Sequence, residues 1–597
     1  MSQTAYRTHH ATEVTEALVG QKVTLAGWVD RRRDHGGVAF IDLRDNTGLV
    51  QIVIYDEEMA RPLRSEFVIQ VTGEVRLRPD GNENTHLATG KIEVVVETID
   101  VLAKSDALPF QVSTALENES ENKLPGEDVR LKYRYLDLRR PSMQHNLKLR
   151  SDMAKAARHA LEEMDFTEVE TPTFIKSTPE GARDFVVPAR LVPGSWYALP
   201  QSPQLLKQLL MVSGVERYYQ LARCYRDEDF RADRQPEFTQ LDMEMAFVDQ
   251  EDVMAMAEKV IAAIWKSAGY DVQLPIQRIT WQDAMDKYGS DKPDLRIDLT
   301  VTDATEALGA CGFGPFEGNT VKAVVVTGFE GTRKQIDKLC ADVEVQSGEK
   351  AYWFRYDENG EIVGGIAKFV QPMKDAVVAA LGLEKGCFVG LTAGKLLAAQ
   401  KAAGVLRSKL GAFCPNHMDK ECYEFCWIVD FPMYEIGEES GLLEFCHNPF
   451  SMPNGGLEIL KKAAAGEVDP LSITAFQYDL VCNGVELSSG AVRNHDPEIM
   501  IEAFQLVRLG EDDVKAKFPA MYNAFTYGAP PHAGIAPGVD RMVMLLAGED
   551  SIREIIPFPM NKNAQDLMMG APSFVTQAQL DELNIVCTKK EEDEAAE

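Results

Sequence analysis

The sequence predicts a multidomain α+β protein with an N-terminal β-barrel, a catalytic domain built on an antiparallel sheet, and an inserted α+β domain. A chain of 597 residues is long enough for roughly three or four domains. Strand-like runs fill the first hundred residues and indicate a small closed barrel. Farther on, two extended runs joined by a polar loop, Tyr218–Cys224 and Glu237–Phe247, indicate an antiparallel pair.

The barrel is expected to have five strands, the number in an OB fold. They span Val23–Val29, Val38–Arg44, Leu49–Ile54, Phe67–Leu77 and Lys91–Leu102. In the second strand the apolar residues Ile41 and Leu43 alternate with polar ones, so Phe40 is expected on the polar face, where OB domains stack a single-stranded base. Donors for phosphates and base edges surround it: Arg31, Arg33, Arg76, Arg78 and Gln51. The alternative is that Phe40 only covers a barrel edge.

After the barrel, the stretch Leu108–Leu138 is polar and rich in Glu and Asn, which is typical of a hinge. Apolar residues from Leu149 to Met164 then recur at helical spacing, and a predicted strand, Phe166–Thr171, ends at Pro172. A one-sided helix before a strand is also ordinary core material. The expected domains are 1–107 (barrel), 108–140 (hinge), 141–287 and 425–558 (catalytic domain), 288–424 (insertion), and 559–597 (C-terminal extension with an acidic tail).

Two segments more than three hundred residues apart carry the chemistry. In the first, Arg226 lies where one predicted strand ends, and Phe238 and Asp242 share a face of the next strand. In the second, Gly538 precedes an apolar helix-like run with Arg541 in its first turn, where backbone amides favour anions. Guanidinium groups stay charged, bind oxyanions through two donors and stack on flat rings. The pattern indicates a polyphosphate site, although the first loop alone could be a solvated, mixed-charge loop.

Together these segments closely resemble motifs 2 and 3 of class II aminoacyl-tRNA synthetases, Arg-x-Glu, loop, Phe-x-x-x-Asp and Gly-x-x-Arg. The resemblance implies that Arg226 bridges the α-phosphate of ATP and the amino acid carboxylate. Phe238 and Arg541 would sandwich adenine, and the catalytic set would be Arg226, Glu228 and Arg541. The implied ATP contacts are Arg226, Asp227, Glu228, Gln235, Phe238, Glu486, Gly538, Val539, Asp540 and Arg541. The helix and strand that end at Pro172 would be motif 1, the interface of a homodimer.

The segments Thr178-Pro-Glu180-Gly-Ala-Arg183 and Gln201-Ser-Pro-Gln204-Leu-Leu-Lys207 resemble the bacterial-type aspartyl branch of that family. The implied aspartate-binding residues are Glu180, Gln204, Lys207, Arg226, Asp242, His447 and Arg493. Lys207 and Arg493 would bind the side-chain carboxylate, because a buried anion without a partner costs about 3–5 kcal/mol. Neutral asparagine lacks that compensation, so the same two cations would reject it.

His447 corresponds in this resemblance to a substrate-binding histidine of a mobile loop. Asn448 follows it where the family often has a second histidine, and a lone histidine before proline is otherwise a surface residue. Asp479 and Glu486 are the expected Mg²⁺ ligands, because magnesium prefers oxygen ligands and bridges one or two carboxylates to substrate phosphates. The alternative there is a strand, a turn and a strand with incidental acids.

The implied reaction is in-line attack of the aspartate α-carboxylate on the α-phosphorus of ATP, followed by transfer to the terminal ribose of tRNA. Positioning and charge neutralisation would carry most of the catalysis, without a protein nucleophile. Asp233 and Arg234, in the loop after Arg226, would face the incoming acceptor end.

The barrel resembles the anticodon-binding domain of the same family. Its anticodon candidates are Arg33, His35, Phe40, Gln51 and Glu93. His35 stands where strictly aspartate-specific relatives often have leucine, and members that charge both aspartate and asparagine tRNAs resemble this stretch. The expected substrates are therefore tRNA-Asp and also tRNA-Asn, which would require a partner amidotransferase. Strict tRNA-Asp specificity, with His35 in a turn of no recognition role, is the alternative.

From about Leu295 to Lys420 the chain has its own strand and helix patterns, such as Val321–Val326 and Arg333–Asp342. It resembles the α+β insertion of bacterial aspartyl enzymes, a module also found in tRNA-dependent amidotransferase subunits. No function for it follows from the residues.

The net charge of −31 and the pI near 4.8 are unusual for a nucleic-acid-binding protein. Basic residues are nevertheless concentrated locally, at 31–33, 76–78 and 130–150, whereas acid gathers in a tail, 591–597, that is expected to be disordered. Ten cysteines without a signal peptide or a membrane-spanning run indicate a reducing cytoplasm. Cys414, His417, Cys422 and Cys426 could offer zinc ligands, but they lack the paired Cys-x-x-Cys spacing, and a buried structural thiol is the simpler interpretation.

Two other functions compete with a tRNA ligase. An ammonia-dependent asparagine synthetase shares the catalytic core but has no use for the barrel, so Phe40 and its arginines disfavour it. A non-catalytic nucleic-acid-binding paralog is expected to have lost Arg226, Glu486 or Arg541, and all three are present.

Overall fold

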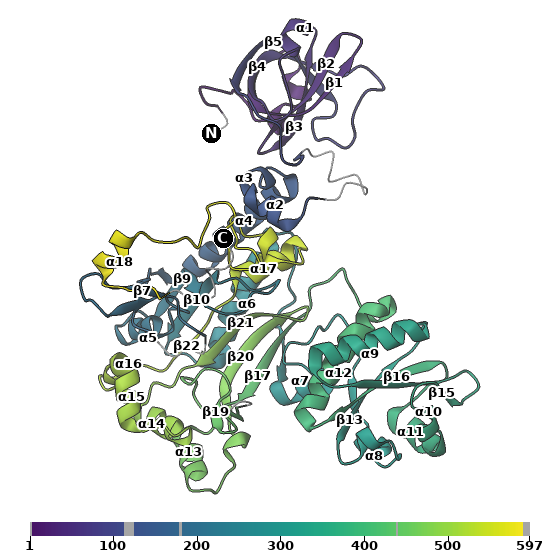
Figure 1. Ribbon diagram of the computed structural model, residues 1–597, viewed down its shortest axis with the longest axis vertical. Coiled ribbons are helices and arrows are strands. Elements are labelled where there is room, and N and C mark those ends of the chain that lie inside the picture. The colour runs from purple at the N-terminus through teal and green to yellow at the C-terminus, as the bar shows by residue number, and fades with distance from the viewer. Residues whose placement is uncertain (1–2, 113–123, 178–181, 438–439, 589–597) are drawn as a thin grey trace. The chain divides into compact units, whose positions relative to one another are not determined.

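The computed structural model describes residues 3–112, 124–177, 182–437 and 440–588, which fold into two compact units (Figure 1). The first unit comprises 1–150, 230–232 and 549–574; the second comprises 151–229, 233–548 and 575–597. The acidic tail 591–597 lies outside the described residues. Among the described residues, no helix is both long enough and apolar enough to cross a bilayer.

The first unit contains the predicted barrel, closed in the order β1-β2-β3-β5-β4. Its strands are β1 (Lys22–His35), β2 (Val38–Asp45), β3 (Gly48–Ile54), β4 (Val68–Leu77) and β5 (Ile92–Ala103), with short helices η1 (Ala11–Glu13), η2 (Glu16–Leu18) and α1 (Glu57–Ala60). The predicted alternation is confirmed only in part: Ile41 and Leu43 are buried in the barrel core and Phe40 is half-buried. Asp42 and Arg44, predicted on the same polar face as Phe40, are buried as well. Strand β1 continues past its predicted end at Val29, which pairs Arg33 with Phe40.

The hinge predicted for 108–140 is only partly irregular, since its second half forms α2 (Glu127–Lys132) and α3 (Arg134–Asp137), followed by α4 (Pro141–Glu162). Arg134 is buried, pairs with Asp137 at 2.6 Å, and donates to the carbonyls of Ile556 and Pro557 at 2.9 and 3.0 Å. These bonds join the segment to a C-terminal stretch that contains η8 (Ile552–Glu554). The sequence pattern missed this because the partners are more than four hundred residues away.

The second unit is built on an eight-stranded sheet in the order β11-β17-β20-β21-β22-β10-β9-β6. The strands are β6 (Thr167–Glu168), β9 (Arg217–Tyr225), β10 (Glu237–Ala246), β11 (Gln277–Thr280), β17 (Phe425–Pro432), β20 (Thr474–Cys482), β21 (Val485–Val492) and β22 (His532–Ile535). The predicted antiparallel pair is β9 and β10, paired from Arg217↔Met245 to Tyr225↔Glu237. The strand predicted for 166–171 forms only the two residues of β6.

Helices and two small hairpins surround this sheet. The helices are α5 (Gln204–Val212), α6 (Gln250–Ser267), α7 (Trp281–Tyr288), α13 (Gly456–Ala464), η7 (Pro470–Ser472), α14 (Pro497–Leu506), α15 (Glu511–Lys517), α16 (Pro519–Phe525), α17 (Val539–Ala547) and α18 (Gln577–Leu583). The hairpins pair β7 (Val186–Pro188) with β8 (Trp196–Ala198), and β18 (Tyr434–Ile436) with β19 (Leu443–Phe445).

The inserted segment forms its own five-stranded sheet, in the order β12-β13-β16-β14-β15, as the α+β prediction required. The strands are β12 (Val301–Asp303), β13 (Thr320–Val326), β14 (Ala351–Tyr356), β15 (Ile362–Val363) and β16 (Cys387–Gly394). The helices are α8 (Thr305–Leu308), η4 (Gly314–Phe316), α9 (Arg333–Ser347), α10 (Ala367–Val370), η5 (Gln371–Met373), α11 (Lys374–Leu381), α12 (Leu396–Phe413) and η6 (Pro415–His417). Two apolar clusters form its core.

Candidate active site

Four charged side chains meet at the centre of the large sheet. Lys207, from α5, lies 2.5 Å from Asp242 Oδ1 and 3.3 Å from Glu244 Oε2, both on β10. Arg493, just after β21, donates from Nε to Glu244 Oε1 at 2.9 Å and from Nη2 to Oε2 at 3.2 Å. All four side chains are at most 3% exposed. The cluster contains two cations and two anions, so it is neutral before any ligand enters.

The two carboxylates of this cluster differ in electrostatics. Burial raises the pKa of Asp242 above its usual value, although Lys207 acts in the opposite direction. Burial also acts on Glu244, but Arg493 and Lys207 outweigh it and lower the pKa of that carboxyl. Glu244 is therefore satisfied within the protein, whereas Asp242 has room for a further positive charge.

Two buried polar atoms at the edge of the cluster lack a hydrogen-bond partner among the described residues: Asp242 Oδ2 and Gln204 Nε2. The hydroxyl of Tyr218 donates to Gln220 Oε1 at 3.0 Å, and burial together with the neighbouring Asp242 raises its pKa. Buried polar atoms are normally paired, so an acceptor and a donor left without partners could serve a ligand with an amino group and an acceptor oxygen. Glu180, predicted for the same task, lies outside the described residues.

Glu244 is the residue of this site that the sequence analysis missed. It follows Asp242 by two positions in β10 and so lies on the same face, a signal that the period of a strand could have provided. Gly534 makes room for it, because a Cβ on Gly534 would lie 1.8 Å from Glu244 Oε2. A larger residue at position 534 would displace the carboxylate that orients Arg493.

The predicted ATP-binding residues gather where β9, β10 and α17 meet. The backbone N–H of Arg226 donates to the carbonyl of Pro236 at 2.8 Å and closes the intervening loop. The Arg226 guanidinium lies over the Phe238 ring, with its central carbon 5.0 Å from the ring centroid. Within the loop, Arg234 pairs with Glu228, and Gln235 is buried.

Helix α17 is locked to β10 at its start. The Asp540 carboxylate accepts the backbone N–H of Thr239 at 2.8 Å, and Gly538 forms a bridge with Gln240. Arg541, in the first turn as predicted, donates from Nη1 to the Glu486 carbonyl at 2.8 Å, while its Nη2 lies 3.5 Å from Asp233 Oδ2. These bonds hold the helix start and its cation beside the hairpin of β20 and β21.

Asp479 and Glu486 lie on that hairpin, in β20 and β21, which a bulge at Leu480 and Val481 brings out of register. Burial and the neighbouring Glu486 raise the pKa of Asp479 well above its usual value. A cation would relieve that repulsion. Among the described residues, no three metal-type ligands come together, so the protein offers a carboxylate pair that fits Mg²⁺ only where phosphate oxygens complete its coordination.

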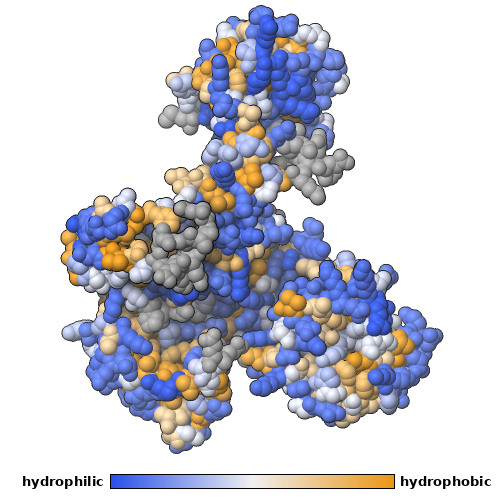
Figure 2. Space-filling model, in the orientation of Figure 1, coloured by the Kyte–Doolittle hydropathy of each residue, from blue (hydrophilic) through white to orange (hydrophobic). Residues whose placement is uncertain are grey.

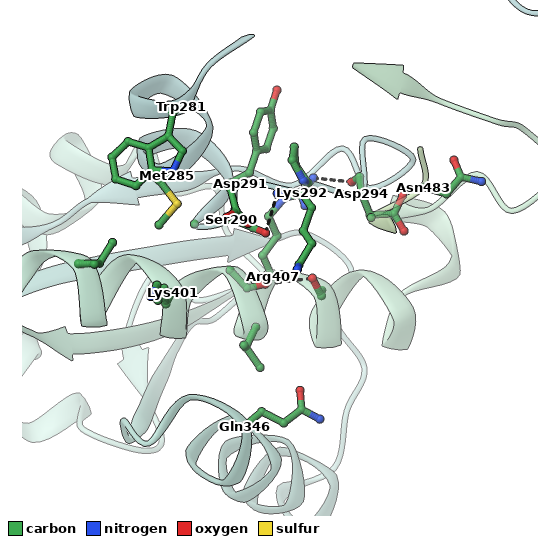
Figure 3. Close-up of a pocket in the computed structure, with 18 of the residues that line it drawn as sticks. Trp281, Met285, Ser290, Asp291, Lys292, Asp294, Gln346, Lys401, Arg407 and Asn483 are labelled. Carbon is green, nitrogen blue, oxygen red and sulfur yellow. Dashed lines mark hydrogen bonds between the residues drawn. The ribbon is translucent and has the colours of Figure 1, made fainter. Parts of the chain in front are cut away.

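The turn between β20 and β21, at Asn483 and Gly484, lines a cavity of about 710 Å³, shown in Figure 3. His447 lines it and packs edge-to-face on Phe431 at 5.1 Å. The residue is exposed to solvent, although desolvation by the neighbouring protein lowers the pKa of its ring. Asn448, the departure noted in the sequence, accepts the backbone N–H of Phe450 at 2.9 Å through Oδ1 and so shapes the loop.

On the barrel, the predicted anticodon residues form a connected polar network. Arg33 Nη2 donates to Asp42 Oδ1 at 2.9 Å and to Gln51 Oε1 at 3.2 Å. Gln51 Nε2 donates to Glu93 Oε2 at 2.7 Å, and Arg76 Nε donates to Glu93 Oε1 at 2.7 Å. Phe40 pairs with Arg33 across the strands, and His35 ends the same strand at an exposed turn. The arrangement presents an aromatic ring beside fixed donors and acceptors.

The four residues considered for zinc do not converge. Both ring nitrogens of His417 are used, Nδ1 with Asp298 Oδ1 at 2.8 Å and Nε2 with the Thr327 carbonyl at 3.0 Å. Cys426 lies buried in β17, while the Cys422 thiol faces the Asp419 carbonyl at 3.7 Å. Ordinary structural contacts therefore account for His417, Cys422 and Cys426.

The sequence-family model for class II tRNA synthetases (D, K and N) matches residues 126–562. The family model for the OB-fold nucleic acid binding domain matches residues 23–102. A protein of Bifidobacterium longum strain DJO10A named aspartate–tRNA(Asp/Asn) ligase is 64% identical, covering 98% of both chains. One of the same name from Zymomonas mobilis is 48% identical, covering 97% of this chain and 98% of its own. The solved aspartyl-tRNA synthetase of Entamoeba histolytica has a similar fold, with a TM-score of 0.56, 19% identity, and coverage of 94% of this chain and 93% of its own.

Proposed function

The chain belongs to the class II tRNA synthetases (D, K and N), and we propose that it is an aspartate–tRNA ligase. It activates L-aspartate with ATP, releases pyrophosphate, and transfers the aspartyl group to the 3′ end of tRNA. The proposal is supported by the names of relatives that cover 98% of this chain. It is supported independently by the charge arrangement of the buried cluster at the centre of the sheet.

The observation that carries the proposal is the presence of two buried cations, Lys207 and Arg493, in the same cluster as the unpartnered Asp242 Oδ2. Aspartate has one ammonium and two carboxylates, so it needs one acceptor and several cationic donors. Asp242 Oδ2, an acceptor without a partner, suits the ammonium. Gln204 Nε2, a donor without a partner, suits a carboxylate oxygen. The pairing of Arg493 with Glu244 does not use Nη1, which suits the side-chain carboxylate. A neutral amide in that position would offer Arg493 only an uncharged acceptor, which binds a guanidinium more weakly than a carboxylate does.

In the proposed reaction, the α-carboxylate of aspartate attacks the α-phosphorus of ATP in line with the departing pyrophosphate. Arg226, on the Phe238 ring, holds the carboxylate and α-phosphate together, and Arg541 binds the far end of the polyphosphate at the start of α17. Glu228, which pairs with Arg234, keeps the loop near the reacting atoms. Magnesium, held by Asp479 and Glu486, would supply charge neutralisation for the phosphates.

For the acceptor, we propose both tRNA-Asp and tRNA-Asn. Phe40 stacks an anticodon base, while the polar network of Arg33, Gln51 and Glu93 reads base edges. The two anticodons differ at one position, and the exposed His35 is proposed to accept either base there. Aspartate attached to tRNA-Asn would need an amidotransferase partner to convert it to asparagine. Because the substrates are ATP and tRNA, the proposed compartment is the cytoplasm.

We further propose a homodimer whose interface comprises the helix and strand that end at Pro172 and the surface that follows them. Apolar side chains are exposed there on and around the β7–β8 hairpin: Phe174, Val186, Leu191, Val192, Trp196 and Tyr197. The rings of Phe174 and Tyr197 pack against each other at 5.6 Å. Most of the face visible in Figure 2 is hydrophilic. An exposed apolar patch on such a surface suggests a contact with another protein chain.

The test is amino-acid-dependent exchange of radioactive pyrophosphate into ATP, with magnesium and without tRNA. We expect exchange with aspartate and none above background with asparagine or glutamate. Exchange with asparagine as good as with aspartate would contradict the assignment of Lys207 and Arg493. An aspartate- and ATP-dependent use of ammonia, without transfer to tRNA, would instead favour an asparagine synthetase.

A further inference from the structure

The loop between β9 and β10 is held at its tip by a distant part of the chain. The base of the loop closes on itself, because the backbone N–H of Arg226 donates to the Pro236 carbonyl at 2.8 Å. The tip, residues 230–232, belongs to the first compact unit, whereas the residues before and after it belong to the second. The tip therefore takes its contacts from a different part of the chain than the base does.

The partners of the tip are η8 and the residue before it. The carbonyl of Ala232 accepts the backbone N–H of the buried Ile552 at 2.9 Å and the hydroxyl of Ser551 at 3.3 Å. Arg553 donates from Nη1 to the carbonyl of Arg231 at 3.4 Å. All three bonds end on backbone oxygens of the loop, so they hold the path of the chain itself.

The short helix η8 is in turn bonded to the two hinge helices. Arg553 donates from Nε to Glu127 of α2 at 2.5 Å, and Arg134 of α3 donates to the Arg553 carbonyl at 2.5 Å. The Glu554 carboxylate accepts both Nη groups of Arg130, at 3.0 and 2.8 Å. The segment that holds the loop tip is therefore fixed at two successive residues.

The guanidinium of Arg553 is the group that joins the hinge to the loop. Its side chain is 14% exposed, with Nε bonded to Glu127 and Nη1 bonded to the loop carbonyl. Because a guanidinium is planar and its donors point in fixed directions, the ion pair on one edge orients the donor that binds the loop. A charged donor also binds a carbonyl more strongly than a neutral donor does.

The tip is a part of the loop that needs such support. Arg231 and Ala232 are exposed, and an exposed loop loses conformational entropy when a ligand orders it. A loop that is held in advance avoids this loss when the ligand binds. The next two residues, Asp233 and Arg234, are those expected to face the acceptor end of tRNA, and Asp233 lies 3.5 Å from Nη2 of Arg541. The bonds from η8 therefore act next to the residues assigned to the transfer step.

We propose that Arg553 is a positioning residue for the transfer of aspartate to tRNA: it holds the tip of the β9–β10 loop where the tip receives the 3′ end. This inference rests on the proposed function, in which that loop meets the acceptor end. Activation uses Arg226, at the base of the loop, where the bond to Pro236 does not involve η8. Loss of the Arg553 contact is therefore expected to affect transfer much more than activation.

The test measures the two steps of the reaction separately in the full chain. Arg553→Met is expected to slow transfer from preformed, enzyme-bound aspartyl-adenylate to saturating tRNA-Asp about 10-fold in a single turnover. Aspartate-dependent pyrophosphate exchange, which needs no tRNA, is expected to stay within about twofold of the wild-type rate. Arg553→Lys keeps the charge but not the planar fork, so its transfer rate is expected to fall between those of the wild type and the methionine variant.

The matched control is Arg130→Met, which weakens the same docking of η8 on α2. Among the residues that the structure describes, the Arg130 side chain bonds to Asp137 and Glu554 and not to the loop. This variant is expected to lower Tm at least as much as Arg553→Met and to leave transfer within about twofold of the wild-type rate. Equal slowing of transfer by the two variants would overturn the inference, because docking of η8 as a whole would then be responsible.

Ser551→Ala keeps the inference testable if Arg553→Met does not fold. It removes one hydroxyl from the Ala232 carbonyl and is expected to slow transfer about threefold without changing pyrophosphate exchange. Transfer at the wild-type rate in this variant, or equal losses of exchange and transfer in Arg553→Met, would contradict the inference. A wild-type chain without aspartate-dependent exchange would instead overturn the proposed function, and this inference with it.

Discussion

Arg493 binds both carboxylate oxygens of Glu244, through Nε at 2.9 Å and Nη2 at 3.2 Å, at the centre of the large sheet. Both side chains are buried, so neither can exchange this partner for water. The pairing orients the guanidinium through Nε and Nη2, so in the proposed function Nη1 is the donor offered to the ligand. Selection of the amino acid in the proposed reaction thus depends on a carboxylate that the substrate does not touch.

Replacing Arg493 by leucine is expected to lower both stability and aspartate activation. Glu244 would keep only Lys207, at 3.3 Å, and an incompletely compensated buried charge costs about 3–5 kcal/mol. We expect aspartate-dependent pyrophosphate exchange to fall at least ~100-fold, measured beside the free energy of unfolding in denaturant. Arg278→Leu, which breaks a more exposed ion pair with Glu251, is the control and is expected to cost at most about 1 kcal/mol. Normal activation of aspartate by the leucine variant would refute the assigned role.

Replacing Phe40 by alanine is expected to affect tRNA and not the amino acid. Loss of one base-stacking contact is worth about 1–3 kcal/mol, so the KM for tRNA-Asp is expected to rise about 10-fold or more. Pyrophosphate exchange, which needs no tRNA, is expected to stay at the wild-type rate. Tyr6→Ala removes another exposed ring of the same unit and serves as the control. Unchanged charging by Phe40→Ala would remove the stacking role.

Replacing His35 by leucine is expected to separate the two tRNA substrates. The side chain is exposed at the end of β1, next to two glycines with positive φ, so the change is expected to leave the barrel intact. We expect kcat/KM for tRNA-Asn to fall about 10-fold while that for tRNA-Asp stays within about twofold. An equal fall in kcat/KM for both tRNAs would indicate that His35 contacts tRNA without distinguishing the two anticodons. No change for either tRNA would mean that other residues choose between the anticodons.

The His417–Asp298 pair is expected to stabilise the inserted domain at low pH. Burial acts to lower the pKa of His417, but the Thr327 carbonyl and Asp298 together raise it above its usual value of 6.5. A raised pKa means that the stabilisation is complete below the unfolded value and is lost as pH rises through the folded value. Asp298→Asn is therefore expected to lower Tm more at pH 5.5 than at pH 8.5. Because both ring nitrogens are occupied, a zinc chelator is expected to leave Tm unchanged, and a drop would revive the metal interpretation.

The sequence predicted the parts of the fold that local periodicity controls. Strand alternation located the barrel and the β9–β10 pair, and a glycine before an apolar run located α17. Distant contacts were beyond its reach: Arg134 joins the segment of α2 and α3 to carbonyls near residue 556, and β6 has only two residues paired with β9. The boundaries of the inserted domain at 288 and 424 remain predictions.

The candidate site was predicted through family resemblance, residue by residue, and the structure brings most of those residues together. Resemblance did not reveal Glu244 or Arg553, because each acts on other protein groups. The structure adds a contact that resemblance did not specify, the Arg226 guanidinium over the Phe238 ring, whereas the adenine contact of Phe238 stays a prediction. Packing of this kind depends on side-chain conformation, which no spacing rule specifies.

The central claim is tested most directly by aspartate attachment to purified tRNA-Asp and tRNA-Asn transcripts, with ATP and magnesium, in parallel reactions with labelled aspartate and asparagine. We expect both tRNAs to be charged with aspartate and neither with asparagine. Failure to attach aspartate to tRNA-Asp would contradict the proposed ligase, whereas charging of tRNA-Asp alone would keep the ligase and remove the proposed role of His35.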